Sequence, residues 1–561
     1  MKLKKNILTL LFAGTGLLIS PSCSLDEVFY SSITADTYFT DKESVYAALS
    51  NPFISWHSFV GQNCFIPQEY TADALVLPIR DKSDWDNGGR DTQMHWHTWT
   101  AASARINNCW NGMTCISRCL ATMESLREVD YEALGLSSTL KEQHQMQLSV
   151  LMAYIYMREL DFFGGVPLYY SSEDPIRGRN TAQETFDYIE KRLLEAIPKL
   201  PVKSALGASE DGYIRQGAAA AMLAQLYFNA KSYIGVEKFG ECKKLCEDII
   251  GGIYGPYELD KTWYGPFSFN NDQSPEAIWN VPSQNSKLQF DWYYGHQYPY
   301  NIQAYFGEGM GGGSNGGQLS PSLDPENNFE PYTKTKSWKL GSPMQKFHAL
   351  DLRVKPYKYL GLGQYEGMLL RDRLPGVIGR KSSAGKEITL KDYICLYSKG
   401  ELISTVEKAE EDSGYRLVKH PIPNAEDIST RYNPDFPLIR LTEIYYMLAE
   451  CKWHEGDRKG AASLINQVRS RNFTGGIDPD PVTDENLDKY RLADEFMIEF
   501  IGEGRRRTDL IRWGMFHTEN WWDHEASNDP NRCRFPVPEK AISANPLLEQ
   551  NPGYGGVTTT E

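Results

Sequence analysis

Positive charge is scarce in this sequence. Its 58 lysine and arginine residues face 73 aspartate and glutamate residues, which leaves a formal net charge of −15 over 561 residues. Three lysines lie within the first five residues, so the rest of the chain is more acidic still. Such a surface repels the phosphates of nucleic acids, and we expect no nucleic-acid partner.

Cysteines and long apolar runs are scarce too. Ten cysteines occur, and no two have the C-x-x-C spacing of a metal knuckle. Cys115 and Cys119, like Cys242 and Cys246, are four residues apart, so each pair shares one face of a predicted helix. We expect most of the cysteines to be small buried apolar residues. After the first 23 residues, no segment reaches the ~20 apolar residues that a membrane-spanning helix needs.

The first 23 residues have the pattern of a secretory leader. Lysines precede an apolar run from Ile7 to Ile19, and small residues then lead to Cys23. The residues from Leu17 to Cys23 resemble a bacterial lipobox, in which the cysteine is diacylated and becomes the new N-terminus. We predict that residues 1–22 are a lipoprotein signal peptide and that Cys23 is lipidated. The alternative is an ordinary leader cleaved nearby, with an incidental cysteine.

Helical periodicity is strong in two parts of the chain. Residues 142–163 carry apolar residues at helical spacing and end at a Gly-Gly pair, and Thr181 with Glu184 predicts a capped start for the next helix. The same hairpin plan recurs at residues 214–250 and 438–471. Hairpins of about 34 residues with alanine and aromatic residues at the packing positions resemble tetratricopeptide units. The alanines of the second hairpin are expected where two helices approach closely: Ala219, Ala220 and Ala224.

The middle of the chain, residues 255–430, is rich in Gly, Pro, Asn and Tyr and has little helical periodicity. Within it, the stretch DWYYGHQYPYNIQAYF at 291–306 is aromatic at seven of sixteen positions, although aromatics make up 12% of the chain. Its glycine, proline and polar residues argue against a helix, so these rings are expected on a loop. Long irregular stretches in compact domains are usually functional loops that a rigid scaffold holds in place.

Six blocks, in order along the chain, resemble elements of the SusD/RagB family of outer-membrane lipoproteins. The blocks are EQHQMQLSVLMAYIYMRELDFFGGVPLYY, GYIRQGAAAAMLAQLYF, FPLIRLTEIYYMLAEC, LINQVRSR, MIEFIGEGRRRTDLIRWG and LLEQNPGY. The acidic Ser-Leu-Asp-Glu after Cys23 also resembles the start of surface-exported lipoproteins of Bacteroidetes-type bacteria. Together with the leader, the resemblance covers nearly the whole chain.

The resemblance implies a mostly α, SusD-like fold over residues 23–561. Divergent tetratricopeptide hairpins would form its scaffold at about 40–250 and 431–520, and a loop-rich ligand-binding region with few short strands would occupy about 255–430. It also implies a surface-exposed lipoprotein of the outer membrane that binds glycans, is not an enzyme and needs no cofactor. Such a protein delivers oligosaccharide to a SusC-like TonB-dependent transporter. Two alternatives stay open: a RagB-type lid for peptide uptake, and a secreted glycosidase.

Sugar recognition needs exposed aromatic faces beside hydrogen-bonding side chains. The stretch at 291–306 offers both, and a second tryptophan, at position 85, stands on a polar Asp-Asn-Gly-Gly loop. The predicted glycan-binding residues are Trp85, Trp292, Tyr293, Tyr294, Tyr298 and Asn301. The alternatives for these rings are packing under a loop or contact with the transporter. Trp96 and Trp99 are expected in the core, since they lead into a predicted helix at residues 100–120.

Three carboxylates, Glu495, Glu499 and Glu503, are spaced to share one helical face, and a carboxylate pair is what glycoside hydrolysis needs. Four arginines follow within nine residues, however, so we interpret the row as a structural ion-pair network and predict no catalytic residue. His95 and His97 would share one face of a strand without an evident third ligand, and we predict no metal site there.

Replacing Cys23 by Ala is expected to release the protein from membranes. Two acyl chains bury enough methylene groups, at ~0.8 kcal/mol each, to hold a folded domain on a bilayer. Cell fractionation should find the variant in the soluble fraction, with an unchanged melting temperature. A variant that stays with the membranes of cells lacking the transporter would contradict the anchor.

Overall fold

The structure is a computed structural model, and it describes part of the chain. The described residues are 38–80, 89–209, 212–285, 287–290, 317–322, 339–374, 388–392, 396–398, 401–403, 405–407, 409, 413–422, 429 and 433–555.

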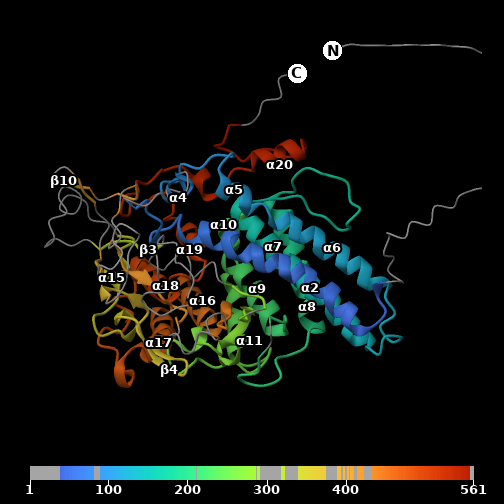
Figure 1. The fold of residues 1–561 in the computed structure, drawn as a ribbon, viewed down its shortest axis with the longest axis horizontal. Helices are drawn as coiled ribbons and strands as arrows, with labels where there is room; N and C mark the ends of the chain where they lie inside the picture. Colours follow the sequence, from blue (N-terminus) through green and yellow to red (C-terminus); the bar gives the residue numbers. More distant parts are fainter. Residues whose placement is uncertain are drawn as a thin grey trace, which may run out of the picture.

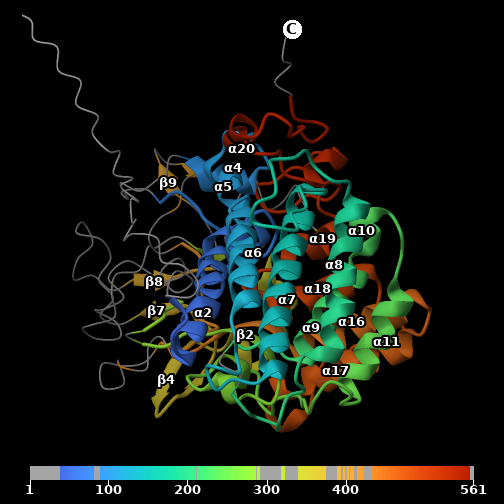
Figure 2. The ribbon, with the colours of Figure 1, turned by 90° about the vertical axis from the view of Figure 1, so that its right-hand side faces the viewer.

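A row of long helices forms the body of the protein. Its members are α2 (Lys42–Ser58), α6 (Gly112–Glu128), α7 (Ser138–Phe163), α8 (Ala182–Ala196), α9 (Gln216–Phe228), α11 (Phe239–Ile250), α16 (Leu441–His454) and α17 (Arg458–Arg469). Each packs against the next, and Figure 2 shows the first four side by side. The contact between α11 and α16 is notable because the whole loop-rich region lies between them in sequence. The predicted mostly α fold is confirmed.

Shorter helices flank this row. They are η1 (Phe59–Phe65, a π-helix), α3 (Ile66–Glu69), α4 (Arg90–His95), α5 (Ala104–Cys109), α10 (Ala230–Ile234), α15 (Pro343–Lys346), α18 (Lys489–Phe500), α19 (Arg506–Arg512) and α20 (Glu539–Ala544). Single 3₁₀ turns are η3 (Ile197–Lys199), η4 (Gly265–Phe267), η5 (Asn271–Gln273), η6 (Leu352–Val354), η8 (Ser470–Asn472), η9 (Thr474–Gly476) and η10 (Pro530–Cys533).

The predicted helix boundaries around residues 163–184 are confirmed. Helix α8 begins with a capping box: the Glu184 N–H donates to the Thr181 hydroxyl (3.1 Å), and the Thr181 N–H donates to the Glu184 carboxylate (2.8 Å). Helix α7 ends at Gly164, whose φ of 77° favours glycine. A β-carbon on Gly165 would lie 1.9 Å from the carbonyl oxygen of Asn180, so only glycine lets these two segments meet.

The short strands pair two by two. They are β1 (Leu75–Val76), β2 (Ala277–Val281), β3 (Gln318–Leu319), β4 (Lys358–Gly361), β5 (Gln364–Glu366), β6 (Leu369–Leu370), β7 (Asp372–Leu374), β8 (Ile388–Leu390), β9 (Leu396–Ser398), β10 (Glu401–Ile403), β11 (Arg416–Leu417) and β12 (Phe436–Arg440). The pairs, all antiparallel, are β1–β3, β2–β12, β4–β5, β6–β11, β7–β8 and β9–β10. Figure 1 shows the helices α6 to α8 on one side of the molecule and β3, β4 and β10 on the other.

Two expectations for helices need correction. The segment FPLIR, grouped with the following helix from sequence, is strand β12, and helix α16 begins only at Leu441. Pairing with β2 explains this, because the residues from Phe436 to Arg440 form an antiparallel ladder with those from Ala277 to Val281. The expected helix leading from Trp99 is interrupted at Trp110 and Asn111, between α5 and α6.

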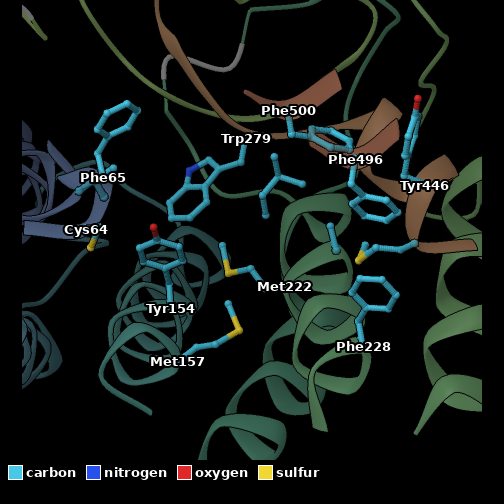
Figure 3. Close-up of a cluster of buried hydrophobic side chains, with 14 of the residues drawn as sticks. Cys64, Phe65, Tyr154, Met157, Met222, Phe228, Trp279, Tyr446, Phe496 and Phe500 are labelled. Atoms are coloured by element: carbon cyan, nitrogen blue, oxygen red, sulfur yellow. The ribbon is translucent and has the colours of Figure 1, made fainter. Parts of the chain in front are cut away.

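The core joins the helices to strand β2. Trp56 of α2 stacks on Trp279 of β2, with ring centres 4.7 Å apart, and Tyr154 of α7 meets Trp279 edge to face at 5.2 Å. Figure 3 shows Tyr154 and Trp279 facing each other, with Met222 of α9 close by. Edge-to-face and offset pairs are the preferred aromatic geometries, so this contact fixes β2 against the helices. Within the described residues, no helix is both long and apolar enough to cross a bilayer.

Helix α9 packs through its alanines, and Ala219, Ala220 and Ala224 are fully buried as predicted. Ala220→Leu is therefore expected to overpack this contact and lower the free energy of unfolding by ~1 to 3 kcal/mol. Denaturant unfolding measures this change. Ala121→Leu, at an exposed position of α6, is the matched control and should leave stability nearly unchanged. Equal stability of the two variants would contradict the close packing.

Candidate functional site

The residues predicted from sequence to bind ligand lie outside the described residues, and so does the predicted lipidation site. They are Trp85, Trp292, Tyr293, Tyr294, Tyr298, Asn301 and Cys23. Their roles stay predictions. The described residues at the ends of these segments, however, show where each segment joins the folded scaffold.

The two aromatic segments join the scaffold at residues that touch. Arg80 comes directly before residues 81–88, which include Trp85, and Gln318 comes just after residues 291–316. The Arg80 guanidinium donates to the side-chain oxygen of Gln318 at 2.6 Å and to the carbonyl oxygen of Ser413 at 3.1 Å. Strands β1 and β3 pair close by, with Leu75 opposite Leu319. Segments more than 200 positions apart in the sequence therefore meet at one place.

The other end of the aromatic stretch is anchored as well. Phe290, which is 2% exposed, packs edge to face against His57 (5.0 Å between ring centres) and lies 5.2 Å from the ring of Phe436. Its backbone N–H donates to the hydroxyl of Ser283 at 3.0 Å. Residues 291–316 are thus held at both ends by buried side chains.

A surface hollow of about 440 Å³ lies beside this anchor. We call it the Phe269 hollow, and its main lining residues are Phe269, Asn270, Gln284, Lys287, Leu288 and Asn433. Residues 284 and 287–288 follow strand β2, and residue 433 precedes β12, so the β2–β12 pair brings the two walls together. The side chain of Asn433 accepts a hydrogen bond from the N–H of Asn285 at 3.2 Å, and that of Asp435 accepts one from Ser283 at 2.8 Å.

The hollow combines an oriented aromatic ring with amides and one cation. The half-buried ring of Phe269 meets Tyr359 of the β4–β5 hairpin at 87° and 5.9 Å, which fixes its orientation. Around it, Asn270, Gln284 and Lys287 are exposed and can exchange hydrogen bonds with a ligand. An apolar face beside amide donors and acceptors suits a ligand that has both C–H faces and hydroxyl groups.

The carboxylates of Glu495, Glu499 and Glu503 form a structural ion-pair network, as predicted, but they do not all share one helix face, because α18 ends at Phe500 and Glu503 lies in the turn after it. The ion pairs are those of Arg440 with Glu276, Glu499 and Glu503, of Arg353 and Arg471 with Glu499, of Lys419 with Glu503, and of Arg469 with Glu495. Glu495 also pairs with Arg491 of the same helix at 2.9 Å, and the other partners come from other segments. The arginines of residues 505–512 pair elsewhere, for example Arg506 with Asp73 and Arg507 with Asp161.

The charge state of this network is set by its arginines. Burial alone raises the pKa of Glu276, but the guanidinium groups of Arg471 and Arg440 outweigh it and lower the pKa to about 2. Burial likewise raises the pKa of Glu499, and Arg440, Arg353 and Arg471 lower it more strongly. A general acid for glycoside hydrolysis needs a raised pKa, so Glu499 does not fit that role.

His95 and His97 do not lie on a strand as expected, because His95 ends helix α4 and His97 has a φ of 54°, and both rings contact backbone carbonyl groups. His95 Nε2 lies 3.1 Å from the carbonyl oxygen of Trp522, and His97 Nε2 lies 2.7 Å from that of Thr71. In the part of the chain that the structure describes, no three His, Cys, Asp or Glu side chains are placed to hold a metal ion. Trp99 is in the core as expected, whereas Trp96 is half-buried and its indole N–H donates to Asp523.

The described cysteines behave as the sequence predicts. Cys115, Cys119, Cys242 and Cys246 are buried free thiols, and burial raises the pKa of each. They therefore pack as small apolar side chains and stay protonated at neutral pH.

Comparison with known proteins shows which family this chain resembles. The model of the SusD family matches residues 275–532, which include the β2–β12 pair and helix α18 but begin after Phe269 and Asn270 of the Phe269 hollow. The starch-binding protein SusD of Bacteroides thetaiotaomicron is 24% identical over 450 residues, which cover 75% of this chain and 74% of the relative. The chain is SusD-like.

Solved SusD-family structures share this fold. A SusD superfamily protein from Parabacteroides distasonis superposes with a TM-score of 0.64 at 17% identity, covering 91% of this chain and 99% of that one. Surface glycan-binding protein A from Bacteroides thetaiotaomicron, solved with laminarihexaose, superposes with a TM-score of 0.62 at 16% identity, covering 91% and 100%. The family predicted from the six sequence blocks is confirmed.

Sequence reasoning missed the Phe269 hollow. Its residues come from three short segments, each too irregular for a periodic pattern, and one of these segments is 148 positions from its hydrogen-bonded partner. The one available signal is Phe269 followed by Asn270 and Asn271, an aromatic ring beside amides like that of the 291–306 stretch.

Acid is expected to destabilise this SusD-family protein partly through His524. Its buried ring stacks on Trp521 at 3.7 Å, and burial, with His95 as a second cause, lowers its pKa to about 3. The unfolded chain binds a proton at this residue below pH ~6.5 and the folded chain does not, so stability present at pH 7 is lost as the pH falls. The loss reaches about 2 kcal/mol at pH 5.

Urea unfolding at pH 7 and pH 5 measures this loss. The variant His524→Gln should have a smaller difference between the two pH values than the wild type, because its side chain does not titrate there. Raised carboxyl pKa values, such as that of Glu69 (about 7), act in the opposite direction but are common to both proteins. Equal differences in variant and wild type would contradict the assignment.

Proposed function

We propose that the protein captures a glycan at the cell surface and delivers it to a SusC-like TonB-dependent transporter. Lipidated Cys23 would hold it on the outer membrane. The proposed ligand contacts are the exposed rings and amides predicted from sequence, Trp85, Trp292, Tyr293, Tyr294, Tyr298 and Asn301, together with the Phe269 hollow.

One observation carries this proposal. The hydrogen bond between Arg80 and Gln318 joins the end of the segment that includes Trp85 to the end of the segment that includes the aromatic stretch at 291–306. Segments that leave a scaffold at one point can approach one ligand together, and loops on a rigid scaffold are where binding residues concentrate. The Phe269 hollow adds an aromatic ring of fixed orientation close to the other end of the second segment.

The relatives support a glycan as the ligand. One is named a starch-binding protein, and a structural neighbour was solved with laminarihexaose. In the Phe269 hollow, a sugar ring would stack one face on Phe269. The hydroxyl groups of the sugar would form hydrogen bonds with Asn270, Gln284 and Lys287. Delivery to a transporter and the membrane anchor rest on family membership and on the sequence of the leader.

The α18 network weighs against the glycosidase alternative. Glu499 is ion-paired to three arginines and has a lowered pKa, whereas retaining and inverting hydrolysis both need one carboxyl group that stays protonated near neutral pH. Binding without cleavage is therefore the activity that we propose.

Alanine at Trp292, Tyr294 or Phe269 is expected to weaken glycan binding about tenfold, because stacked aromatic rings contribute ~0.5 to 1.5 kcal/mol beyond the area that they bury. Calorimetric titration with maltohexaose and laminarihexaose measures the dissociation constants. Affinity should be micromolar at best, since the protein must release its cargo.

The control is Tyr46→Ala, which removes a 45% exposed ring of α2 and should bind like the wild type. Normal binding by the alanine variants would assign those rings to packing or to transporter contact. Binding of extended peptides in place of both sugars would favour a peptide-uptake lid. Reducing ends that accumulate during incubation with pure protein would favour a hydrolase.

A further inference from the structure

A second surface hollow, also of about 440 Å³, lies on the helical side of the molecule. It is bounded by the loop that follows α7 and by the outer face of α8, and we call it the Tyr170 hollow. Its lining includes Tyr170, Tyr188, Asn180, Asp187 and Lys191. Figures 1 and 2 both show α8 well away from β4, whose hairpin packs on the Phe269 hollow, so the two hollows occupy different faces.

The ring of Tyr170 is exposed but held in place. The backbone N–H groups of Tyr170 and Ser171 donate to one carboxylate oxygen of Asp174 at 2.7 and 3.2 Å. The same oxygen is paired with Arg177 at 3.2 Å, and the Arg177 guanidinium lies 5.9 Å from the centre of the Tyr170 ring. A turn braced in this way orders the ring before any ligand arrives, which reduces the entropy lost on binding.

The ring is also the outer member of a ladder of tyrosines. Tyr156 is fully buried, Tyr188 is 9% exposed and Tyr170 is 61% exposed. Tyr188 meets Tyr156 edge to face at 5.1 Å and meets Tyr170 edge to face at 5.4 Å. Its hydroxyl donates to the carbonyl oxygen of Tyr169 at 3.1 Å, and the Arg192 guanidinium lies 4.4 Å from its ring centre. Tyr170 therefore presents a rigid aromatic surface anchored in the core.

The opposite wall is polar. Successive turns of α8 place Asp187 and Lys191 on this wall, both exposed, and Asn180 lies at its edge. Carboxylates slightly outnumber cations in the lining. The carboxylates are Glu184, Asp187 and Glu195, and the cations are Lys191 and Arg192. Carboxylates and an ammonium group accept and donate hydrogen bonds with hydroxyls, whereas a surplus of carboxylates disfavours an anionic ligand.

We infer that the Tyr170 hollow is a second saccharide-binding site, specific for uncharged sugars, an inference that rests on the proposed glycan-binding function. A sugar ring stacks one C–H face on Tyr170, and its hydroxyls bond to Asp187, Lys191 and Asn180. A volume of about 440 Å³ lies within the range of roughly 300 to 1,000 Å³ typical of small-ligand sites. The two sites together would hold one long polysaccharide at two points.

Calorimetric titration of the full chain with maltohexaose and laminarihexaose tests the inference. Four proteins are compared: the wild type, Tyr170→Ala, the triple variant Trp292→Ala/Tyr294→Ala/Phe269→Ala, and the triple variant combined with Tyr170→Ala. The triple variant should retain a weaker site for the hexasaccharide that the wild type binds. Adding Tyr170→Ala should weaken that remaining binding about tenfold or more.

Two further variants serve as controls. Tyr170→Phe keeps the ring and should keep the remaining binding, whereas Tyr46→Ala removes an exposed ring that lines neither hollow and should change nothing. Thermal melting verifies that each variant is folded. Tyr170 is 61% exposed, so its replacement should leave the melting temperature close to that of the wild type.

The outcomes separate the two proposals. A triple variant with no binding, or with binding that Tyr170→Ala leaves unchanged, overturns the second site while the glycan-binding function stands. A wild type that binds neither hexasaccharide counts against both. Remaining binding that is stronger for an acidic hexasaccharide, such as an oligogalacturonate, overturns the assignment to uncharged sugars.

Discussion

The buried ion pairs of Arg440 hold the described structure together. Arg440 is 1% exposed, and its guanidinium contacts Glu276 at 2.9 Å, Glu499 at 3.0 Å and Glu503 at 2.7 Å. Removing one partner of a buried pair leaves an uncompensated charge and typically costs about 3–5 kcal/mol. Because Glu276 precedes β2 and Arg440 ends β12, these contacts align the two strands with each other and with α18.

The strand pair in turn positions the Phe269 hollow and the start of the aromatic stretch. One wall of the Phe269 hollow follows β2, and the other precedes β12. Phe290 packs on Phe436 of β12 directly before the aromatic stretch. A buried centre of paired charges thus supports irregular segments at the surface. Because the paired charges serve the buried scaffold and the proposed ligand contacts lie at the surface, the carboxylates of α18 are structural although their spacing resembles a catalytic pair.

The two hollows share a design despite their separate positions. In each, an aromatic ring is oriented by a second ring that meets it edge to face, Tyr359 against Phe269 and Tyr188 against Tyr170. Polar side chains from a neighbouring segment form the other wall. Two weak sites on one chain would bind a polymer more strongly than either alone, because the second contact is intramolecular once the first has formed.

The sequence by itself determined the features that depend on local pattern. Apolar periodicity, the Thr181 capping box and the run of alanines in α9 identify helices because each rests on residues within a few turns of one another. Ordered blocks of residues identified the SusD family. Adjacent charges also showed that Glu495, Glu499 and Glu503 belong to ion pairs, although they did not reveal the partners, which lie as far away as Glu276 and Arg353.

Only the tertiary structure decided which distant segments meet. The contact of Arg80 with Gln318 spans 238 positions, and that of Asn285 with Asn433 spans 148. No local pattern encodes either, because such contacts arise when the helices pack and bring their loops to one surface. The same holds for FPLIR, which resembles the start of a helix in sequence but forms strand β12, because β2 lies beside it and pairs with it. The aromatic residues that we propose as ligand contacts were visible in the sequence, whereas the contact between Arg80 and Gln318 beside their segments was not.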